Sequence, residues 1–206
     1  MDPQILYFEQ GTDEWYAARA GIPTASMFAT VQAKGKGGGA SITRRKYMLQ
    51  LAGERLTGKP MEGYVNNHME RGKEMEAEAR DLYAMVHNCE PQQVGFIRRG
   101  DSGASPDSLV DNHGLLEVKT KLPHLQIEVL LANRLPPEHV AQVQGQLWVS
   151  CREWLDFVSY WPGLPLFVTR VQRDEKYIAE LSVAVSEFNE ELNAVVNQIS
   201  NYRRAA

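Results

Sequence analysis

Residues 105–119 constrain the fold more than any other stretch of the chain. They read S-P-D-S-L-V-D-N-H-G-L-L-E-V-K, and residues 111–114 have the residue types of a tight turn between two extended segments. Alternation along the second segment sends Glu117 and Lys119 to one face and the apolar side chains beside them to the other. A hairpin paired in this way brings Asp107 close to both charged side chains.

These three charged residues have a defined chemistry if they meet. Asp107 and Glu117 would form a hard-oxygen site suited to Mg²⁺ or Mn²⁺. Lys119 beside them can hold or deprotonate a water molecule. Together they are the groups needed for metal-assisted hydrolysis of a phosphodiester. The alternative is an ordinary turn aspartate after Pro106 and a solvated ion pair of little energetic value, which the short pattern taken alone favours.

Composition indicates one globular domain in a reducing compartment. The chain has 206 residues, of which 43% are hydrophobic, and a net charge of -4, so nucleic-acid binding would need a local basic patch. Cys89 and Cys151 form neither a disulfide framework nor a paired metal motif. No stretch approaches the length and hydropathy of a membrane span. We therefore expect a cytoplasmic protein that does not contact a membrane.

The pattern of apolar residues, caps and turn residues predicts helices first, then a sheet, then helices. The expected helices cover residues 13–19, 24–32, 41–57, 66–87 and 138–150, with a last one from 174 onward. The expected strands cover residues 94–99, 105–111, 115–120, 153–161 and 166–172. A glycine-rich basic loop, residues 33–40, separates the second and third helices, and it either tracks a phosphate backbone or is simply solvated.

Five strings, in order along the chain, resemble those of the YqaJ-like viral recombinases, a family of exonucleases in the PD-(D/E)xK nuclease superfamily. They are E-W-Y-A-A-R-A-G-I-P-T-A-S (14–26), R-G-K-E-M-E-A-E-A-R (71–80), the 105–119 string, H-V-A-Q-V-Q-G-Q-L-W-V (139–149) and R-D-E-K-Y (173–177). The resemblance implies a restriction-endonuclease-like α/β (α+β) core, with a mixed central sheet flanked by helices. It implies one nuclease domain over residues 1–206, in which residues 1–65 form a DNA-end pocket and residues 66–206 hold the nuclease core and C-terminal helix.

The resemblance also assigns roles to the residues of the 105–119 string. It implies that Asp107, Glu117 and the backbone carbonyl of Val118 hold two metal ions, with Mg²⁺ expected and Mn²⁺ also suited. Lys119 would position or activate the attacking water.

Two helical residues are implied to complete this site. Glu76 would add to the shell of the second metal ion or act through water, although spacing alone does not choose it over Glu74. Gln142 would order a water or a phosphate oxygen. It shares a helix face with Gln146 and not with Gln144, and the alternative for Gln142 is an ordinary polar helix face.

A second cluster matches the family's pocket for a 5′-phosphate at a DNA end. It consists of Arg19, Thr24, Ser26 and Ser105. An arginine can grip phosphate oxygens in a bidentate manner, and Thr24 and Ser26 stand at an expected helix N-terminus, which favours an anion. The alternative is that Thr24 or Ser26 is only an N-cap. The chain lacks the arginine that the family has after the catalytic lysine, here Lys119.

The resemblance implies an activity and partners for the whole protein. We expect a Mg²⁺-dependent 5′→3′ exonuclease that digests one strand of linear double-stranded DNA to mononucleotides and leaves a 3′ overhang. Met69 would be an apolar wedge between the strands, or ordinary packing. Implied partners are DNA ends, two further copies in a ring-shaped homotrimer, and a single-strand annealing protein, in a phage or prophage system of a bacterial host. A structure-specific endonuclease of the same fold and a catalytically silent DNA-end-binding protein are the alternatives.

Overall fold

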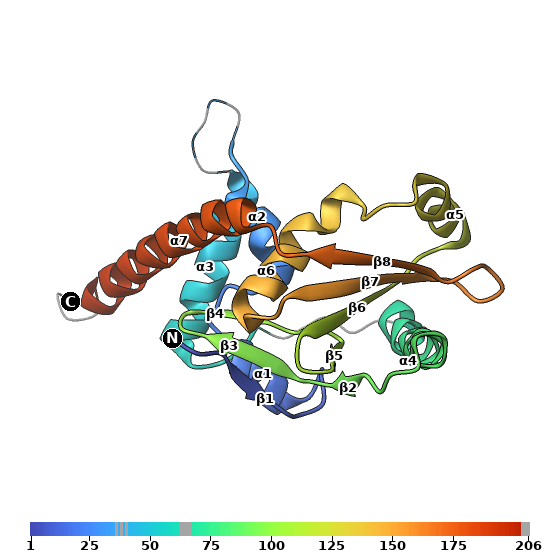
Figure 1. Cartoon of the computed structure of the whole chain (residues 1–206). Coiled ribbons are helices and arrows are strands. Elements are labelled where there is room, and N and C mark those ends of the chain that lie inside the picture. The colour runs from blue at the N-terminus through green and yellow to red at the C-terminus, as the bar shows by residue number, and fades with distance from the viewer. Residues whose placement is uncertain (36, 38, 40, 62–66, 203–206) are drawn as a thin grey trace.

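The computed structural model describes residues 1–35, 37, 39, 41–61 and 67–202, with the side chains of residues 67–73 excepted. At its centre is a five-stranded mixed sheet in the order β2-β5-β6-β7-β8 (Figure 1). Its strands are β2 (Gln92–Gln93), β5 (Ser108–Val110), β6 (Gly114–Thr120), β7 (Trp154–Tyr160) and β8 (Phe167–Gln172). The β6–β7 pair is parallel and the other pairs are antiparallel.

The parallel pair requires a crossover connection, because two parallel neighbours cannot be joined by a tight turn. The crossover contains α5 (Pro123–Ala132), the 3₁₀ turn η2 (Pro137–His139) and α6 (Val140–Ser150). Figure 1 shows α5 and α6 on one side of the sheet and α4 (Asn67–His87) on the other. Strand β6 therefore lies between α6 and α4, with both of its faces covered.

The N-terminal part adds a small antiparallel sheet and a group of helices. The sheet has the order β1-β3-β4, with β1 (Gln4–Leu6), β3 (Phe96–Arg99) and β4 (Ser102–Ala104). The helices are α1 (Asp13–Arg19), the 3₁₀ turn η1 (Ala25–Met27), α2 (Phe28–Gln32) and α3 (Ile42–Thr57), and the long C-terminal α7 (Glu175–Tyr202) packs against α2 and α3.

The two faces of the central sheet bury two separate apolar clusters. Leu115 of β6 belongs to the larger cluster, which includes residues of α2, α3, α6 and α7. Leu116 and Val118 belong to the smaller one, with Ala79 and Tyr83 of α4. This confirms the alternation predicted for β6, and it places Glu117 on the same face as Leu115, toward α6.

Most elements confirm the predictions from the sequence. The Thr12 hydroxyl caps α1 by accepting from the Trp15 N–H, the Ser41 hydroxyl caps α3, and Gly58 ends α3 in the left-handed region at φ 67°. The described residues include no helix that is long and apolar enough to span a lipid bilayer.

Two expectations about the elements were wrong in detail, and some elements were not expected. The helix expected at 24–32 is divided into η1 and α2, and no side-chain cap is made by Thr24. The strand expected at 105–111 is limited to β5, because the preceding residues 102–104 pair with β3 in the other sheet. Helix α5 and strand β1 were not predicted.

Candidate active site

The turn at residues 111–114 brings Asp107 beside strand β6. Pairing of Ser108 with Leu116 sets the register of the hairpin. One residue beyond β5, the Asp107 N–H donates to the Leu116 carbonyl (3.0 Å), and the Asp107 carboxylate Oδ2 accepts from the Val118 N–H (2.6 Å). The carboxylate is therefore fixed next to Glu117 by two backbone contacts.

Two glutamines of α6 hold the carboxylate of Glu117, which is only 2% exposed. Oε1 accepts from Nε2 of Gln142 (2.5 Å), and Oε2 accepts from Nε2 of Gln146 (2.6 Å). The two glutamines are four residues apart, so they project from the same face of the helix. Helix α6 thus supplies a pair of amide donors to an anion buried on β6.

Lys119 completes this group from the same strand face. Its Nζ lies 2.5 Å from Glu117 Oε1. Burial lowers the pKa of Lys119, but the carboxylates of Glu117, Asp107 and Glu76 more than offset this, and the pKa is raised above its ordinary value. Lys119 is therefore a charged ammonium group at neutral pH.

The carboxylates around Lys119 repel one another. Burial raises the pKa of Asp107 well above its ordinary value, and the charges of Glu117 and Glu76 raise it further. Burial also raises the pKa of Glu76, an effect that Arg80 opposes across 3.4 Å and that Glu117 adds to. Glu74, by contrast, is exposed. We call the β5–β6 hairpin with Asp107, Glu117 and Lys119 the acidic hairpin. The structure therefore brings Glu76, and not Glu74, into the electrostatic environment of the acidic hairpin.

The donor set is suited to a divalent cation, since carboxylate oxygens are preferred by Mg²⁺ and Mn²⁺ and their mutual repulsion favours a positive ion among them. In the described part of the chain, no three acidic, histidine or cysteine side chains are arranged closely enough to hold a metal ion. Instead, the Lys119 ammonium forms an ion pair with the Glu117 carboxylate, and the amides of Gln142 and Gln146 donate hydrogen bonds to it. A metal would thus exchange places with contacts that Glu117 makes in this structure.

Asp107 and Glu76 both line a cavity of about 680 Å³ between α4 and the N-terminal segment. Tyr7 and Arg80 stand among its other walls. The side-chain amide of Gln10 closes one side, donating to the carbonyls of Val94 (2.9 Å) and of Pro106 (3.0 Å). These bonds connect residues 7–10 to Pro106, the residue directly before Asp107. Because Asp107 itself lines the cavity, the cavity opens onto the acidic hairpin.

Arg19 and Ser105, two residues of the predicted phosphate pocket, are in direct contact. The Arg19 guanidinium donates to Ser105 Oγ (2.9 Å) and lies over the ring of Trp15, 4.0 Å from its centroid. The Trp15 indole N–H donates to the same Ser105 oxygen (3.1 Å) and to the Gly95 carbonyl (3.0 Å). Burial lowers the pKa of Arg19. A half-buried arginine is therefore bonded to the hydroxyl of Ser105, which lies two residues before Asp107 in the sequence.

Thr24 and Ser26 lie on a neighbouring segment. Their hydroxyl oxygens are 3.3 Å apart, and a parallel bridge joins Thr24 to Gly103, two residues before Ser105. The expected helix N-terminus is here the start of the 3₁₀ turn η1, and anion binding by Thr24 and Ser26 stays a prediction. The turn η1 has three residues, and the Thr24 N–H already donates to the Tyr47 hydroxyl (3.2 Å). Thr24 is the N-cap residue of η1, but its side chain makes no capping hydrogen bond.

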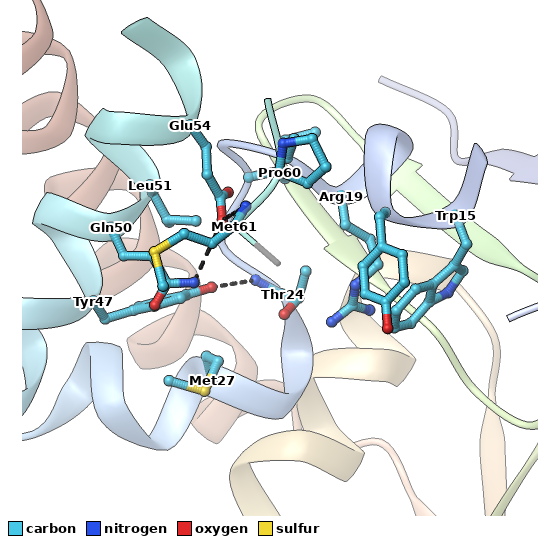
Figure 2. Close-up of a pocket in the computed structure, with 13 residues that line it drawn as sticks. Trp15, Arg19, Thr24, Met27, Tyr47, Gln50, Leu51, Glu54, Pro60 and Met61 are labelled. Carbon is cyan, nitrogen blue, oxygen red and sulfur yellow. Dashed lines mark hydrogen bonds between the residues drawn. The ribbon is translucent and has the colours of Figure 1, made fainter. Parts of the chain in front are cut away.

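Figure 2 shows the pocket that Arg19 and Thr24 share, which lies between α1 and α3 and has a volume of about 260 Å³. Arg19 and Tyr47 approach Thr24 from opposite sides (Figure 2). Glu54 forms the far end, where its carboxylate accepts from the Gly21 N–H (2.7 Å) and the Met61 N–H (3.3 Å). Aromatic rings of α1 and α3 and one guanidinium are thus gathered around a single opening.

Some predicted site residues are not placed. The side chain of Met69 lies outside the described residues, and the basic loop is described only in part, so both roles stay predictions. The contact of Val118 that the structure gives is made by its N–H, and the role of its carbonyl also stays a prediction.

Sequence reasoning missed Gln146 and Gln10 as residues of the site. The spacing of Gln146 from Gln142 was a signal that could have found it, since both project toward β6. The contacts of Trp15 and Gln10 join residues 80 to 96 positions apart, and no local pattern reveals such pairs.

The mixed sheet, the helices on its faces and the acidic hairpin with its lysine define a nuclease of the restriction-endonuclease-like class. The chain belongs to the YqaJ-like viral recombinase family, whose domain model matches residues 14–153. The comparison with curated proteins found no significant match.

Three solved structures are similar to this chain in fold. The alkaline exonuclease LHK-Exo from Laribacter hongkongensis is 37% identical, superimposes with a TM-score of 0.85, and the match covers 94% of this chain and 99% of that one. Its complex with dAMP gives the same values. A phage related exonuclease from Haemophilus somnus is 15% identical, with a TM-score of 0.65 and coverage of 86% and 96%, and shows likeness of fold alone.

Proposed function

We propose that the protein is a Mg²⁺-dependent 5′→3′ exonuclease on linear double-stranded DNA. It digests one strand to mononucleotides and leaves a 3′ single-stranded overhang for recombination by strand annealing. Family membership and the 37% identity to an alkaline exonuclease support a DNA exonuclease. The observation that carries the proposal is the contact of Glu117 with Lys119 beside the fixed carboxylate of Asp107.

Asp107 and Glu117 would hold two divalent ions, with Glu76 and the Val118 carbonyl completing the site. When bound, such ions stabilise the attacking and the leaving oxygen of a phosphodiester. The nearby carboxylates support this role, because Glu117 and Glu76 disfavour the charged form of Asp107, Glu117 disfavours that of Glu76, and a bound cation would relieve both effects.

Lys119 and Gln142 would act as donors at the reacting centre. The raised pKa of Lys119 supports a charged side chain that holds a water molecule or a phosphate oxygen rather than one that removes a proton. Gln142 is partly exposed, and its amide donates to Oε1 of Glu117, the same oxygen that the Lys119 ammonium contacts. Both donors are therefore positioned to leave Glu117 for substrate when a cation takes their place.

Arg19, Ser105, Thr24 and Ser26 would bind the 5′-phosphate of the DNA end. Ser105 and Asp107 are two residues apart, so a phosphate at Arg19 would place the next phosphodiester near the acidic hairpin. Charge-assisted bonds from a guanidinium are among the strongest that a phosphate can accept. This arrangement supports release of one nucleotide at a time, and the homologous LHK-Exo has been crystallised with the mononucleotide dAMP.

We further propose that the enzyme acts as a homotrimer that surrounds the duplex, with Met69 as a strand wedge. Its partner would be a single-strand annealing protein in the cytoplasm of a bacterial host, encoded by a phage or prophage. The description of the family as viral recombinases supports the recombination context.

A time course on end-labelled linear duplex, first with Mg²⁺ and then with a chelator, tests this function. We expect mononucleotides from the 5′ strand with Mg²⁺ and no cleavage after chelation. A covalently closed circle is the control substrate. Digestion of the circle would favour the alternative of an endonuclease with the same metal site, whereas binding of ends without cleavage would favour the silent DNA-end-binding protein.

A further inference from the structure

Each oxygen of the Glu117 carboxylate has its own amide donor from α6. Gln142 donates to Oε1, which also contacts the Lys119 ammonium, and Gln146 donates to Oε2 (2.6 Å). Gln142 is partly exposed, whereas Gln146 is 1% exposed. The two carboxylate oxygens thus differ: Oε1 lies on the open side of the site and Oε2 on the buried side.

The orientation of the Gln146 amide is set by Glu117. An ionised carboxylate only accepts hydrogen bonds, so Nε2 must face it and Oε1 must face away. Within the described residues, Oε1 of Gln146 is buried and has no hydrogen-bond partner. An unpaired buried acceptor destabilises the folded protein. Gln146 is therefore not a core residue whose polar atoms are all satisfied, and its contact with Glu117 needs another explanation.

Gln144 of the same helix provides the contrast. It is also buried, at 4% exposure, but both ends of its amide bond to backbone. Its Nε2 donates to the Gln172 carbonyl (2.9 Å), and its Oε1 accepts from the Asp174 N–H (2.9 Å). Gln144 therefore joins α6 to the segment between β8 and α7, which is a structural role on the other face of the helix.

We propose that Gln146 is a positioning residue for the metal site: by holding Oε2, it turns the Glu117 carboxylate so that Oε1 faces the divalent cation and Lys119. This inference rests on the proposed function. Mutation of a residue that orients a metal-ligating side chain typically lowers metal affinity or activity by about 10–100-fold. A merely structural glutamine would change stability and leave metal affinity as it is.

The test compares Gln146→Met with Gln144→Met, since methionine keeps the length of the side chain and removes both halves of the amide. Binding of Mn²⁺ to the DNA-free protein is measured from the electron paramagnetic resonance signal of the unbound ion, and melting temperature is measured without metal. We expect Gln146→Met to weaken Mn²⁺ binding by about 10-fold or more. We expect Gln144→Met to lower the melting temperature while Mn²⁺ binding stays within about 2-fold of wild type, because its partners are backbone groups far from Glu117.

The outcomes separate this inference from the proposed function. Wild-type Mn²⁺ binding by Gln146→Met, in an enzyme that binds the ion and cleaves DNA, would overturn the role of Gln146 alone. A wild-type protein that binds no Mn²⁺ would overturn both. If Gln146→Met does not fold, the side-chain amide resonances of the wild-type protein decide: on adding Mg²⁺, we expect the Gln146 resonance to shift and that of Gln144 to stay. An unmoved Gln146 resonance would contradict the proposal.

Discussion

The Asp107 carboxylate accepts a 2.6 Å hydrogen bond from the Val118 N–H, in the strand that carries Glu117 and Lys119. This bond fixes an aspartate from just beyond one strand against the backbone of the next. It brings the carboxylate to the two charged side chains that follow the turn. The acidic hairpin is therefore organised by backbone contacts.

Asp107→Asn is expected to stabilise the metal-free protein and to abolish cleavage. Because the pKa of Asp107 is raised in the folded state, its carboxyl contributes stability below its ordinary pKa near 3.8, and this is lost as the pH rises through the raised value. Asparagine carries no charge and can still accept from Val118. Melting temperatures in EDTA between pH 4 and 9 should thus fall less steeply for the variant. A steeper fall than in wild type would contradict the burial of an uncompensated charge.

Lys119→Met is expected to reduce cleavage by about 10²-fold or more, the usual contribution of a positioned proton donor or acceptor. Removing the cation from among three carboxylates should leave Mn²⁺ binding equal or stronger. The matched control is Lys176→Met, an exposed lysine at the start of α7. Single-turnover rates on 5′-phosphorylated duplex provide the measurement. Rates within about 2-fold of wild type for Lys119→Met would exclude a role in the reaction.

Arg19→Ala is expected to remove the preference for 5′-phosphorylated ends. A hydrogen bond to a charged group contributes about 1.5–3 kcal/mol, so the rate ratio between phosphorylated and unphosphorylated duplex should fall by about 10-fold or more. The two substrates are compared with both proteins. An unchanged ratio would show that Arg19 serves only to hold Trp15 and Ser105 in place.

Gly145→Ala is expected to destabilise the packing of α6 against η1 and α2. A methyl group at this position would lie 2.4 Å from the Phe28 ring and 3.3 Å from Ala25. Overpacking of this kind costs about 1–3 kcal/mol. Urea unfolding monitored by circular dichroism measures the change. Stability equal to wild type would mean that Phe28 moves aside without loss of packing.

Local patterns were enough to predict the acidic hairpin. The turn residues at 111–114 and the alternation along β6 bring Asp107, Glu117 and Lys119 together, and both are properties of neighbouring residues. The i,i+4 spacing likewise placed Gln142 and Gln146 on one face of α6. The choice of Glu76 over Glu74 came from the family resemblance, since the helix alone offers both.

Other features depend on contacts between distant segments. Helix α5 was missed because its apolar residues do not gather on one stripe, so no helical period was visible. The division of the expected 24–32 helix into η1 and α2 was not predicted either, and here the Thr24 N–H contacts the distant Tyr47 hydroxyl. The joint contact of Trp15 and Arg19 with Ser105 links α1 to a segment about ninety positions away, which sequence spacing does not reveal.

The central claim is that Asp107 and Glu117 bind divalent ions beside Lys119. Crystals grown with Mn²⁺ and measured at the manganese absorption edge test it most directly. The account predicts anomalous density between the Asp107 and Glu117 carboxylates, with the Lys119 ammonium moved away from Glu117. An intact Lys119–Glu117 ion pair at saturating Mn²⁺, with no anomalous density at either carboxylate, would contradict the claim.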